Sequence, residues 1–374
     1  MLIRTLVVDD TVLFRKLISE ASAAFPGVEV VGTAASGAIA LKKLHQSPVD
    51  LVLLDVHMAD MDGVQTLEHI RLEFPDTAVV MVSGVSTRSA DSTIRALELS
   101  ALDFIRKPDS SDYQENVLRL REDLKNVFRS LETRMLTRGL RKSADAPLHD
   151  RPLAAPSAAP GPPHAPAVDP ATSHRLPDTL DLVVLGVSTG GPEALSRVIP
   201  ALPADLGVPV VLVQHMPPHF TRSLAESLGK KSALEVVEAV SDGELRPGRV
   251  YIAPGGQHLV VREHQGRLYA MLNADPPENS CRPSVDVLFR SVAGACGDRG
   301  VLAVILTGMG SDGLRGVEAL KKKKCYCLTQ NEATCVVYGM PRAVDDARFS
   351  DESLPVSGMA ARITEIVRHC HKRI

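Results

Sequence analysis

The stretch "LVVLGVSTGGPEAL", residues 182–195, decides how the second half of this chain folds. An apolar run leads directly into Ser188, and the turn that follows contains Gly-Gly-Pro (190–192). The run predicts a buried strand, and a proline near the first helical position predicts that a helix begins there. A phosphate-binding loop, an activated nucleophile and an ordinary strand-to-helix turn would all fit a serine at such a point.

Two phosphate-binding patterns do not match this turn. A P-loop needs a lysine after the glycines, and none follows here. A dinucleotide fingerprint needs GxGxxG, but Ser188 stands where the second glycine would let the pyrophosphate approach. The pattern G-x-S-x-G does match, over residues 186–190, and it places a serine on a sharp turn before a helix whose N–H groups can bind an oxyanion. An ordinary turn remains the alternative for this short pattern alone.

The composition is that of a globular protein with two domains. The chain has 374 residues, of which 44% are hydrophobic and 23% charged, and this length exceeds one ordinary core. A net charge of −3 gives no electrostatic reason to expect a nucleic acid or an anionic membrane as partner. The start "MLIRTLVVDD" reaches acidic residues too early for a signal peptide, and no apolar run is long enough to span a bilayer. We therefore expect no nucleic-acid partner and no membrane insertion.

All six cysteines fall in the second half of the chain, and no two of them form a CxxC pair. Cys325 and Cys327 make a CxC, but alternate positions on a strand suit small buried side chains better than a zinc site. The cysteine pattern therefore predicts a reduced, cytoplasmic protein without a structural metal.

A segment rich in proline and alanine, residues 144–177, separates the two domains. It lacks any run of large apolar residues, so it cannot bury enough surface to offset its ordering entropy and is expected to be disordered. We assign residues 1–125 to the first domain, 126–177 to a helical extension and this linker, and 178–374 to the second domain.

Before the linker, short apolar runs alternate with segments of helical length. Within residues 11–25, for example, Leu13, Leu17 and Ile18 follow the helical spacing. This alternation predicts a parallel sheet with helices on both faces, in which ligands lie beyond the carboxyl ends of the strands. The apolar runs are "TLVVDD" (5–10), "DLVLLD" (50–55), "AVVMVS" (78–83) and "ALDFIRKP" (101–108).

Polar and charged residues stand at the ends of these predicted strands. Asp9, Asp10 and Asp55 would converge on one edge of the sheet, where they would repel one another unless a hard cation such as Mg²⁺ lay among them. Ser83 and Lys107 end two further strands, and their hydroxyl and ammonium groups suit the oxygens of a transferred phosphoryl group. Any one of the acidic residues alone could simply solvate a turn.

Residues 1–125 resemble the receiver domain of two-component response regulators, and these strand-end residues carry the resemblance. The resemblance implies a flavodoxin-like α/β fold in which Asp55 accepts a phosphoryl group from a sensor histidine kinase. It also implies that Asp9 and Asp10, together with Asp55, hold Mg²⁺.

The same resemblance implies roles for three residues on the later strands. Ser83 and Lys107 would sense the phosphoryl oxygens, and Phe104 stands where the family often carries a switch aromatic. The stretch "DVHMADMDG" (55–63) departs from the usual pattern, because Ala59 occupies a position where proline is common. That departure removes a turn constraint and leaves the phosphorylation chemistry intact.

After the linker, apolar runs and helical segments alternate again, which predicts a second parallel α/β sheet. His215 ends the run after the strand of Ser188, and Asp312 lies just beyond a later run, so all three fall on the carboxyl edge of one sheet. A nucleophile needs a base, and the base needs an orienting group, which these three residues could supply. The predicted strands are 181–188, 207–216, 248–255, 301–310 and 325–330.

Two members of this trio have alternatives. His215 could be a partly buried histidine bonded to backbone, and His219 is a rival base on the same loop. Asp312 could be a helix N-cap before Leu314. The chain order Ser, His, Asp also differs from the Ser, Asp, His order of the α/β-hydrolases, so that fold is not expected.

Residues 181–370 resemble the catalytic domain of the chemotaxis-type protein-glutamate methylesterases, which also act as protein-glutamine glutaminases. Together with the receiver domain, this resemblance covers nearly the whole chain outside the linker. It rests on the stretches "GVSTGGPEAL", "VQHMPPHFT", "RPSVDVLF", "ILTGMGSDG" and "TQNEATCVVYGMPRAV".

The resemblance implies a Rossmann-like domain with a triad of Ser188, His215 and Asp312. It also implies that Thr189 and Met309 line the site and contribute to binding the oxyanion. Two features depart from the family: the linker is longer than expected, and "KKKKCYC" replaces small residues. The lysines of that run are expected to form a solvated helix end.

The implied activity is a phosphorylation-regulated hydrolysis. The enzyme would release methanol from methylated glutamates on the cytoplasmic helices of chemoreceptors and would deamidate receptor glutamines. Mg²⁺ would serve phosphorylation, and no cofactor is expected for ester hydrolysis. A response regulator with a DNA-binding output is an alternative, but the second half shows no basic recognition helix. A non-catalytic scaffold is another, although all three triad residues and both glycines are present.

Overall fold

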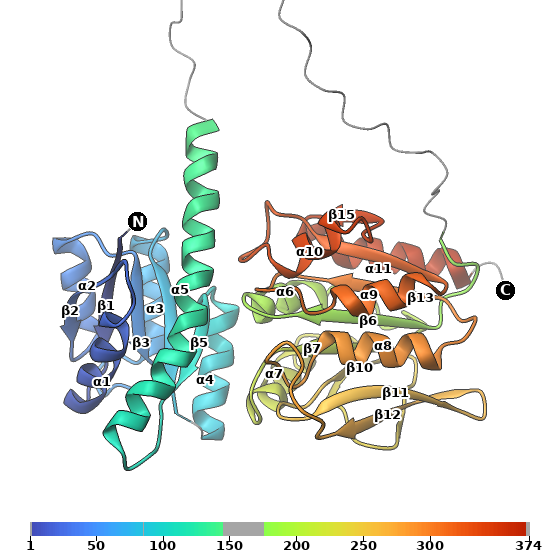
Figure 1. Ribbon diagram of the computed structural model, residues 1–374, viewed down its shortest axis with the longest axis horizontal. Coiled ribbons are helices and arrows are strands. Elements are labelled where there is room, and N and C mark those ends of the chain that lie inside the picture. The colour runs from blue at the N-terminus through green and yellow to red at the C-terminus, as the bar shows by residue number, and fades with distance from the viewer. Residues whose placement is uncertain (1, 85, 145–175, 372–374) are drawn as a thin grey trace, which may run out of the picture.

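The computed structural model describes residues 2–84, 86–144 and 176–371. Within these ranges the chain forms two α/β domains, which lie side by side in Figure 1. The disordered linker that we predict at 144–177 lies outside the described residues except at its two ends. No helix in the described part of the chain is long and apolar enough to cross a membrane.

The first domain is a five-stranded parallel sheet with helices on both faces (Figure 1). Its strands are β1 (Ile3–Val8), β2 (Val28–Ala34), β3 (Leu51–Asp55), β4 (Ala78–Ser83) and β5 (Asp103–Arg106). Its helices are α1 (Val12–Ala23), α2 (Gly37–Gln46), α3 (Gly63–Glu73), α4 (Thr87–Glu98) and α5 (Tyr113–Ala144). The strand order β2-β1-β3-β4-β5 is flavodoxin-like, with the switch point between β1 and β3, so this predicted fold is confirmed.

The second domain is built on a seven-stranded parallel sheet, which confirms the prediction of a second doubly wound fold. Its strands are β6 (Leu182–Val187), β7 (Val210–Gln214), β8 (Glu235–Glu238), β10 (Arg249–Ile252), β13 (Val301–Ile305), β14 (Cys325–Gln330) and β15 (Glu352–Leu354). Its helices are α6 (Gly191–Val198), α7 (Phe220–Gly229), α8 (Val285–Ala295), α9 (Leu314–Lys321), α10 (Met340–Asp346) and α11 (Val356–His371). The order β15-β14-β13-β6-β7-β10-β8 places β6 beside the point where the winding reverses.

A three-stranded antiparallel sheet was not predicted from the sequence. It consists of β9 (Gly243–Glu244), β11 (His258–His264) and β12 (Arg267–Asn273). Leu259 and Val261 of β11 belong to the same apolar cluster as Phe289 of α8, so the small sheet packs against that helix. The sequence did not indicate these strands because their apolar alternation is incomplete: β11 ends in exposed polar residues, and β9 is very short.

The turn after β6 requires its two glycines. Gly190 has a φ of 76°, which is left-handed, and a side chain there would meet Val336. A methyl group at Gly191 would lie 1.9 Å from Oε1 of Gln214. Pro192 then stands in the first turn of α6, as predicted.

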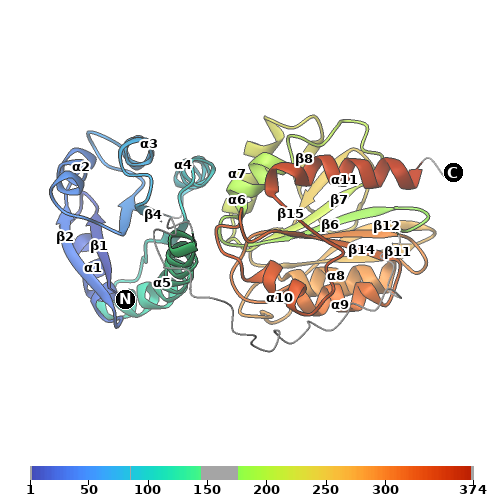
Figure 2. The ribbon, with the colours of Figure 1, turned by 90° about the horizontal axis from the view of Figure 1, so that it is seen from above.

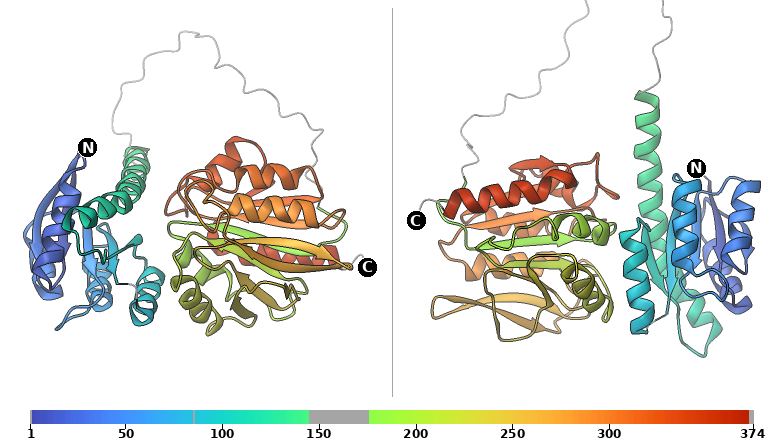
Figure 3. Two further views of the ribbon diagram at one scale, coloured as in Figure 1. Left: turned by 60° about the horizontal axis from the view of Figure 1, so that its bottom comes forward. Right: turned by 180° about the vertical axis from the view of Figure 1, so that it is seen from behind.

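The domains contact each other through α4 and β5 of the first and through α6 and α7 of the second (Figures 2 and 3). The ring centroids of Phe104 on β5 and Phe220 on α7 are 4.4 Å apart. Glu98 of α4 accepts hydrogen bonds from Ser227 of α7 (2.7 Å) and from Lys231, just beyond the end of that helix (2.6 Å). One apolar cluster is therefore continuous from the first domain into the second, with an ion pair at its edge.

We predict that Gly191→Ala lowers the free energy of unfolding by about 1–3 kcal/mol, because the new methyl group must displace the buried Gln214 amide. Gly294→Ala is the matched control, since a methyl group there would meet no atom within 4 Å and alanine favours the helix. Urea unfolding followed by circular dichroism measures both variants. Equal stability of the two would contradict the close packing of this turn.

Candidate functional site

Three neighbouring strands bring Ser188, His215 and Asp312 to one edge of the second sheet. Ser188 follows β6 directly, His215 follows β7 directly, and Asp312 lies on the loop between β13 and α9. The backbone N–H of His215 donates to the carbonyl of Val187 (3.1 Å), so the first two residues lie on adjacent strand ends. The sheet order β13-β6-β7 thus collects the predicted trio beside the switch point.

His215 and Asp312 form a direct hydrogen bond. The distance from Nε2 of His215 to Oδ2 of Asp312 is 2.7 Å, and only 3% of the Asp312 side chain is exposed. The same Oδ2 accepts the backbone N–H of Val285 (2.7 Å). His219, the rival base, instead occupies the N-cap position of α7 with a φ of 71°. The ring bonded to the carboxylate is therefore that of His215.

The second oxygen of Asp312 is also fully used. Oδ1 accepts hydrogen bonds from Asn279 Nδ2 (2.8 Å) and Ser284 Oγ (2.9 Å), and from the backbone N–H groups of Asp286 (3.0 Å) and Gly313 (3.1 Å). Such donors stabilise a buried carboxylate in its charged form. The bond from the Gly313 N–H places Asp312 beside the start of α9, close to the position that the N-cap alternative gave it. The N-cap residue of α9 is Gly313, however, and within the residues that the structure describes no side-chain hydrogen bond caps this helix.

The pKa values of the pair follow from these contacts. Burial alone would raise the pKa of Asp312, but the hydrogen bonds from His215 and from the backbone hold it well below its ordinary range. Burial alone would lower the pKa of His215, but the bonds with Asp312 and Cys281 raise it above its ordinary value. The pair is thus an ionised carboxylate beside an imidazole that favours its protonated form.

Ser188 stands next to this pair without being bonded to it. Among the described residues, no hydrogen bond joins Ser188 Oγ to His215; Nδ1 of the ring instead faces Sγ of Cys281 at 3.5 Å. The side-chain amide of Gln214 donates to the carbonyls of both Ser188 (3.0 Å) and His215 (3.2 Å), which ties the two strand ends together. Catalytic hydrogen bonds are often long in the free enzyme and tighten when substrate binds.

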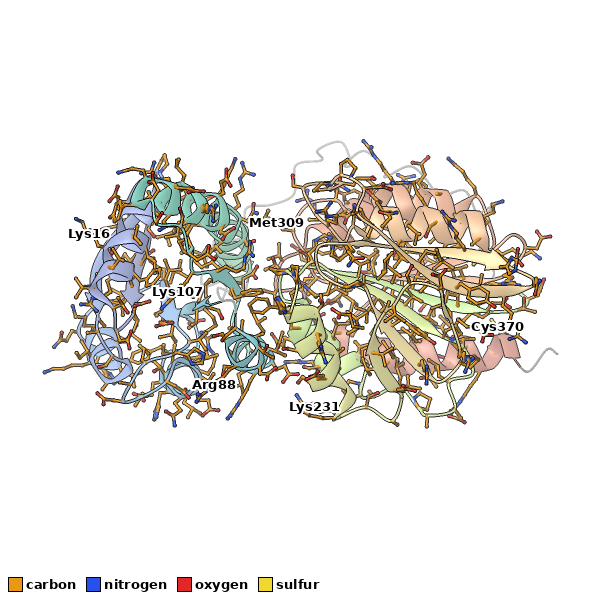
Figure 4. The ribbon with its side chains drawn as sticks, turned by 90° about the horizontal axis from the view of Figure 1, so that it is seen from below. Lys16, Arg88, Lys107, Lys231, Met309 and Cys370 are labelled. Atoms are coloured by element: carbon orange, nitrogen blue, oxygen red, sulfur yellow. The ribbon has the colours of Figure 1, made fainter. Side chains whose placement is uncertain are left out.

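Both residues expected to line the site contact the receiver domain. Thr189 Oγ1 donates to Asp103 Oδ2 (2.9 Å), and Ser130 Oγ of α5 donates to Met309 Sδ (3.4 Å). Figure 4 shows Met309 at the boundary between the two domains. Burial raises the pKa of Asp103 to about 6, although bonds from the Phe104 backbone and Thr189 oppose this. The receiver therefore lies against the rim of the site.

The first domain gathers the predicted phosphoacceptor residues at its switch point. Carboxylate oxygens of Asp9, Asp10 and Asp55 all lie within 4.8 Å of one another. Lys107 Nζ lies 2.7 Å from both Asp9 Oδ2 and Asp55 Oδ2. Burial raises the pKa of Asp55 to about 6, against the opposing effect of Lys107. Three oxygen donors with this spacing and surplus negative charge fit a Mg²⁺ ion.

The two expected switch residues already have partners. Ser83 is buried, and its hydroxyl accepts a hydrogen bond from Thr93 Oγ1 of α4 (2.8 Å). Phe104 packs on Phe220 across the domain boundary. Sequence reasoning did not identify Asp103, Phe220 or Cys281, because contacts between distant segments leave no mark in local periodicity.

Two family descriptions match this chain: "Response regulator receiver domain" over residues 5–118 and "CheB methylesterase" over residues 183–363. A "Protein-glutamate methylesterase/protein-glutamine glutaminase" from Desulfotalea psychrophila is 41% identical over 380 residues, covering 98% of this chain and 99% of that protein. One from Symbiobacterium thermophilum is 42% identical and covers 98% and 97%. The crystal structure of the Thermotoga maritima CheB methylesterase catalytic domain has 40% identity and a TM-score of 0.49, and covers 50% of this chain and 100% of that one. The alternative of a DNA-binding output domain is therefore wrong.

We predict that His215 titrates above pH 6.5 in the folded protein, and that Asp312→Asn lowers its pKa by about one unit or more. Because folding raises this pKa, the stabilisation is fully present below the unfolded value and is lost as pH rises through the folded value. Nuclear magnetic resonance of the imidazole carbons measures the titration. Glu235→Gln is the control, since Glu235 pairs with Arg249 on a neighbouring strand rather than with the ring or the turn that holds Cys281. An unchanged His215 pKa in Asp312→Asn would contradict the assigned ion pair.

Proposed function

We propose, from the premise that this chain belongs to the protein-glutamate methylesterase/protein-glutamine glutaminase family, that it demethylates glutamate side chains of chemoreceptors and deamidates receptor glutamines. The single observation that carries the mechanism is the 2.7 Å bond between His215 and Asp312, one strand away from Ser188. A buried base with an orienting carboxylate, beside a serine on a sharp turn, suits acyl transfer.

Ser188 Oγ attacks the γ-carbonyl carbon of the glutamate methyl ester, and His215 takes the hydroxyl proton. The tetrahedral intermediate collapses, His215 gives the proton to the leaving oxygen, and methanol departs. Water then attacks the acyl-enzyme in the same way and releases the free glutamate and Ser188. With glutamine as substrate the leaving group is ammonia. The N-terminus of α6 begins at Gly191, directly behind Ser188, and its dipole favours the negative charge of the intermediate.

The nitrogen that exchanges the proton is Nδ1. Asp312 occupies Nε2, so the other ring nitrogen is the one that can serve Ser188. In the resting structure that nitrogen faces Cys281, so the Ser188 side chain must turn toward it when substrate binds. Because the pKa of His215 is raised, the rate should increase with pH until the imidazole is neutral.

Phosphorylation of Asp55 by a sensor histidine kinase regulates this reaction in the proposed scheme. Asp9, Asp10 and Asp55 would hold Mg²⁺, which neutralises carboxylate charge as the phosphoryl group arrives. Lys107 is placed to contact the phosphoryl oxygens, since it already lies against Asp55. The added negative charge on Asp55 is the signal to which the rest of the receiver responds.

β4, β5 and the residues that they contact connect Asp55 to the catalytic domain in this scheme. A phosphoryl oxygen on Asp55 would attract Ser83 away from Thr93, and β5 would shift with it. Phe104 and Asp103 on β5 hold Phe220 and Thr189 of the catalytic domain, so this shift loosens the docked receiver. The unphosphorylated receiver thus hinders access to Ser188, and phosphorylation relieves the hindrance.

We predict that Ser188→Ala lowers methanol release from methylated receptor membranes by about 10⁴-fold, the usual effect of losing a triad member. His219→Ala is the matched control on the next loop and should retain most of the activity, because His219 stands at the N-cap of α7 and the ring bonded to Asp312 is that of His215. Methanol released from methyl-labelled receptors is measured for both. Near-normal turnover of Ser188→Ala would remove the nucleophile assignment.

We predict that Glu98→Ala raises the methanol-release rate of the unphosphorylated protein toward that of the phosphorylated protein. The substitution deletes the contacts of α4 with Ser227 and Lys231 and so weakens docking. Glu68→Ala, which breaks an exposed ion pair with Arg95 inside the receiver, should leave the rate unchanged. Equal methanol-release rates for the two unphosphorylated variants would contradict the proposal that docking hinders access to the site.

A further inference from the structure

Cys281 is a nucleophilic side chain that the proposed reaction does not use, although it contacts the catalytic base. Its Sγ lies 3.5 Å from Nδ1 of His215, the nitrogen assigned to proton exchange with Ser188. The thiol is partly exposed rather than buried. A thiol beside a basic imidazole is the arrangement that generates a reactive thiolate.

A rigid turn holds the thiol at this nitrogen. Glu278 and Cys281 exchange two backbone hydrogen bonds (3.1 and 2.9 Å), and Asn279 and Ser280 between them have φ values of 52° and 61°. Positive φ at both central residues is the geometry of a tight hairpin turn, which asparagine tolerates. The thiol position is therefore set by the backbone and not by a mobile loop end.

Side-chain contacts lock this turn from both sides. The Asn279 amide donates to Asp286 Oδ2 (2.9 Å) and to Oδ1 of Asp312 (2.8 Å). Glu278 receives two hydrogen bonds from Arg290 of α8 (2.6 and 2.7 Å). The carboxylate that orients the imidazole thus also anchors the segment that carries the thiol.

The other cysteines have surroundings that favour an unreactive thiol. Cys296, Cys327 and Cys370 are buried, and Figure 4 shows Cys370 at the end of the catalytic domain far from the receiver. Cys325 and Cys335 are partly exposed but donate to backbone carbonyls, and burial raises the pKa of each thiol to about 12. These environments provide controls within the same molecule.

We propose that Cys281 is an oxidation site at which hydrogen peroxide switches the esterase off. The thiol proton moves to Nδ1 of His215, and the thiolate attacks the outer oxygen of the peroxide. An S–O bond forms as the O–O bond breaks, and the departing hydroxide takes the imidazolium proton to leave as water. Sulfur loses two electrons to the peroxide, so the products are a sulfenic acid and water.

The consequence for activity rests on the function proposed above. An oxygen added to Sγ would occupy the space beside Nδ1 and hydrogen-bond to that nitrogen, so Ser188 could not deliver its proton there. A thiol reductant restores the free thiol, which makes the inactivation reversible. Phosphorylation of the receiver would not restore activity, because the sulfenic acid acts at the base whereas the receiver acts at the rim of the site.

Labelling of the full-length protein tests the thiol independently of esterase activity. Hydrogen peroxide is added with dimedone, which traps sulfenic acids, and the labelled peptides are quantified by mass spectrometry. Cys281 should be labelled about tenfold or more faster than Cys335, and His215→Gln should lower the Cys281 rate by about tenfold. Cys335→Ser is the matched control and should leave Cys281 labelling unchanged. Equal labelling of Cys281 and Cys335 within the wild-type molecule overturns the proposal even if His215→Gln does not fold.

Methanol release provides the second measurement, with each variant compared with its own untreated rate. Peroxide should lower the wild-type rate about tenfold or more, and dithiothreitol should restore it, while Cys281→Ser should be resistant to peroxide. Equal loss in Cys281→Ser would place the inactivating oxidation elsewhere, for instance at Met309. If untreated wild-type protein released no methanol, the proposed function would fail, and the labelling result would still decide whether Cys281 is a peroxide-reactive site.

Discussion

The second domain depends on keeping one buried carboxylate charged. Asp312 is almost fully removed from solvent, and a charge in that position is costly unless hydrogen-bond donors surround it. Its oxygens take donors from the loop before α8, from the start of α8, from the start of α9 and from the ring that ends β7. Satisfying this single group therefore fixes the mutual positions of three segments that are distant in sequence: the end of β7, the stretch from Asn279 into α8, and the start of α9.

The domain interface uses α4 and β5, the elements that carry the signal from Asp55 in the proposed scheme. α4 and β5 carry Glu98, Asp103 and Phe104, each of which touches the catalytic domain, and the hydroxyl of Ser83 is bonded into α4. A small apolar contact with a few polar bonds at its edge can release without unfolding either domain.

Much of the fold and of the site could be predicted because parallel sheets obey a simple rule. The carboxyl ends of adjacent strands meet at one edge, so Ser188 and His215, or Asp9 and Asp55, must lie close once the strands are recognised. Asn279 and Cys281 escaped prediction because their placement depends on a left-handed turn with no apolar periodicity. The contact between Asp103 and Thr189 escaped it because it joins two domains across a linker that carries no pairing signal.

In the proposed scheme the two ring nitrogens of His215 have different roles, and this difference separates two kinds of control. Nε2 is committed to Asp312, so any group that occupies Nδ1 decides whether the base can act. The receiver touches Thr189 and Met309 at the rim, and in the proposed scheme it hinders the substrate there without contacting the imidazole. Cys281, at the end of the turn of residues 278–281, contacts the imidazole instead. In the proposed scheme, control of access and control of the base therefore act through different atoms, so that one can change while the other stays as it is.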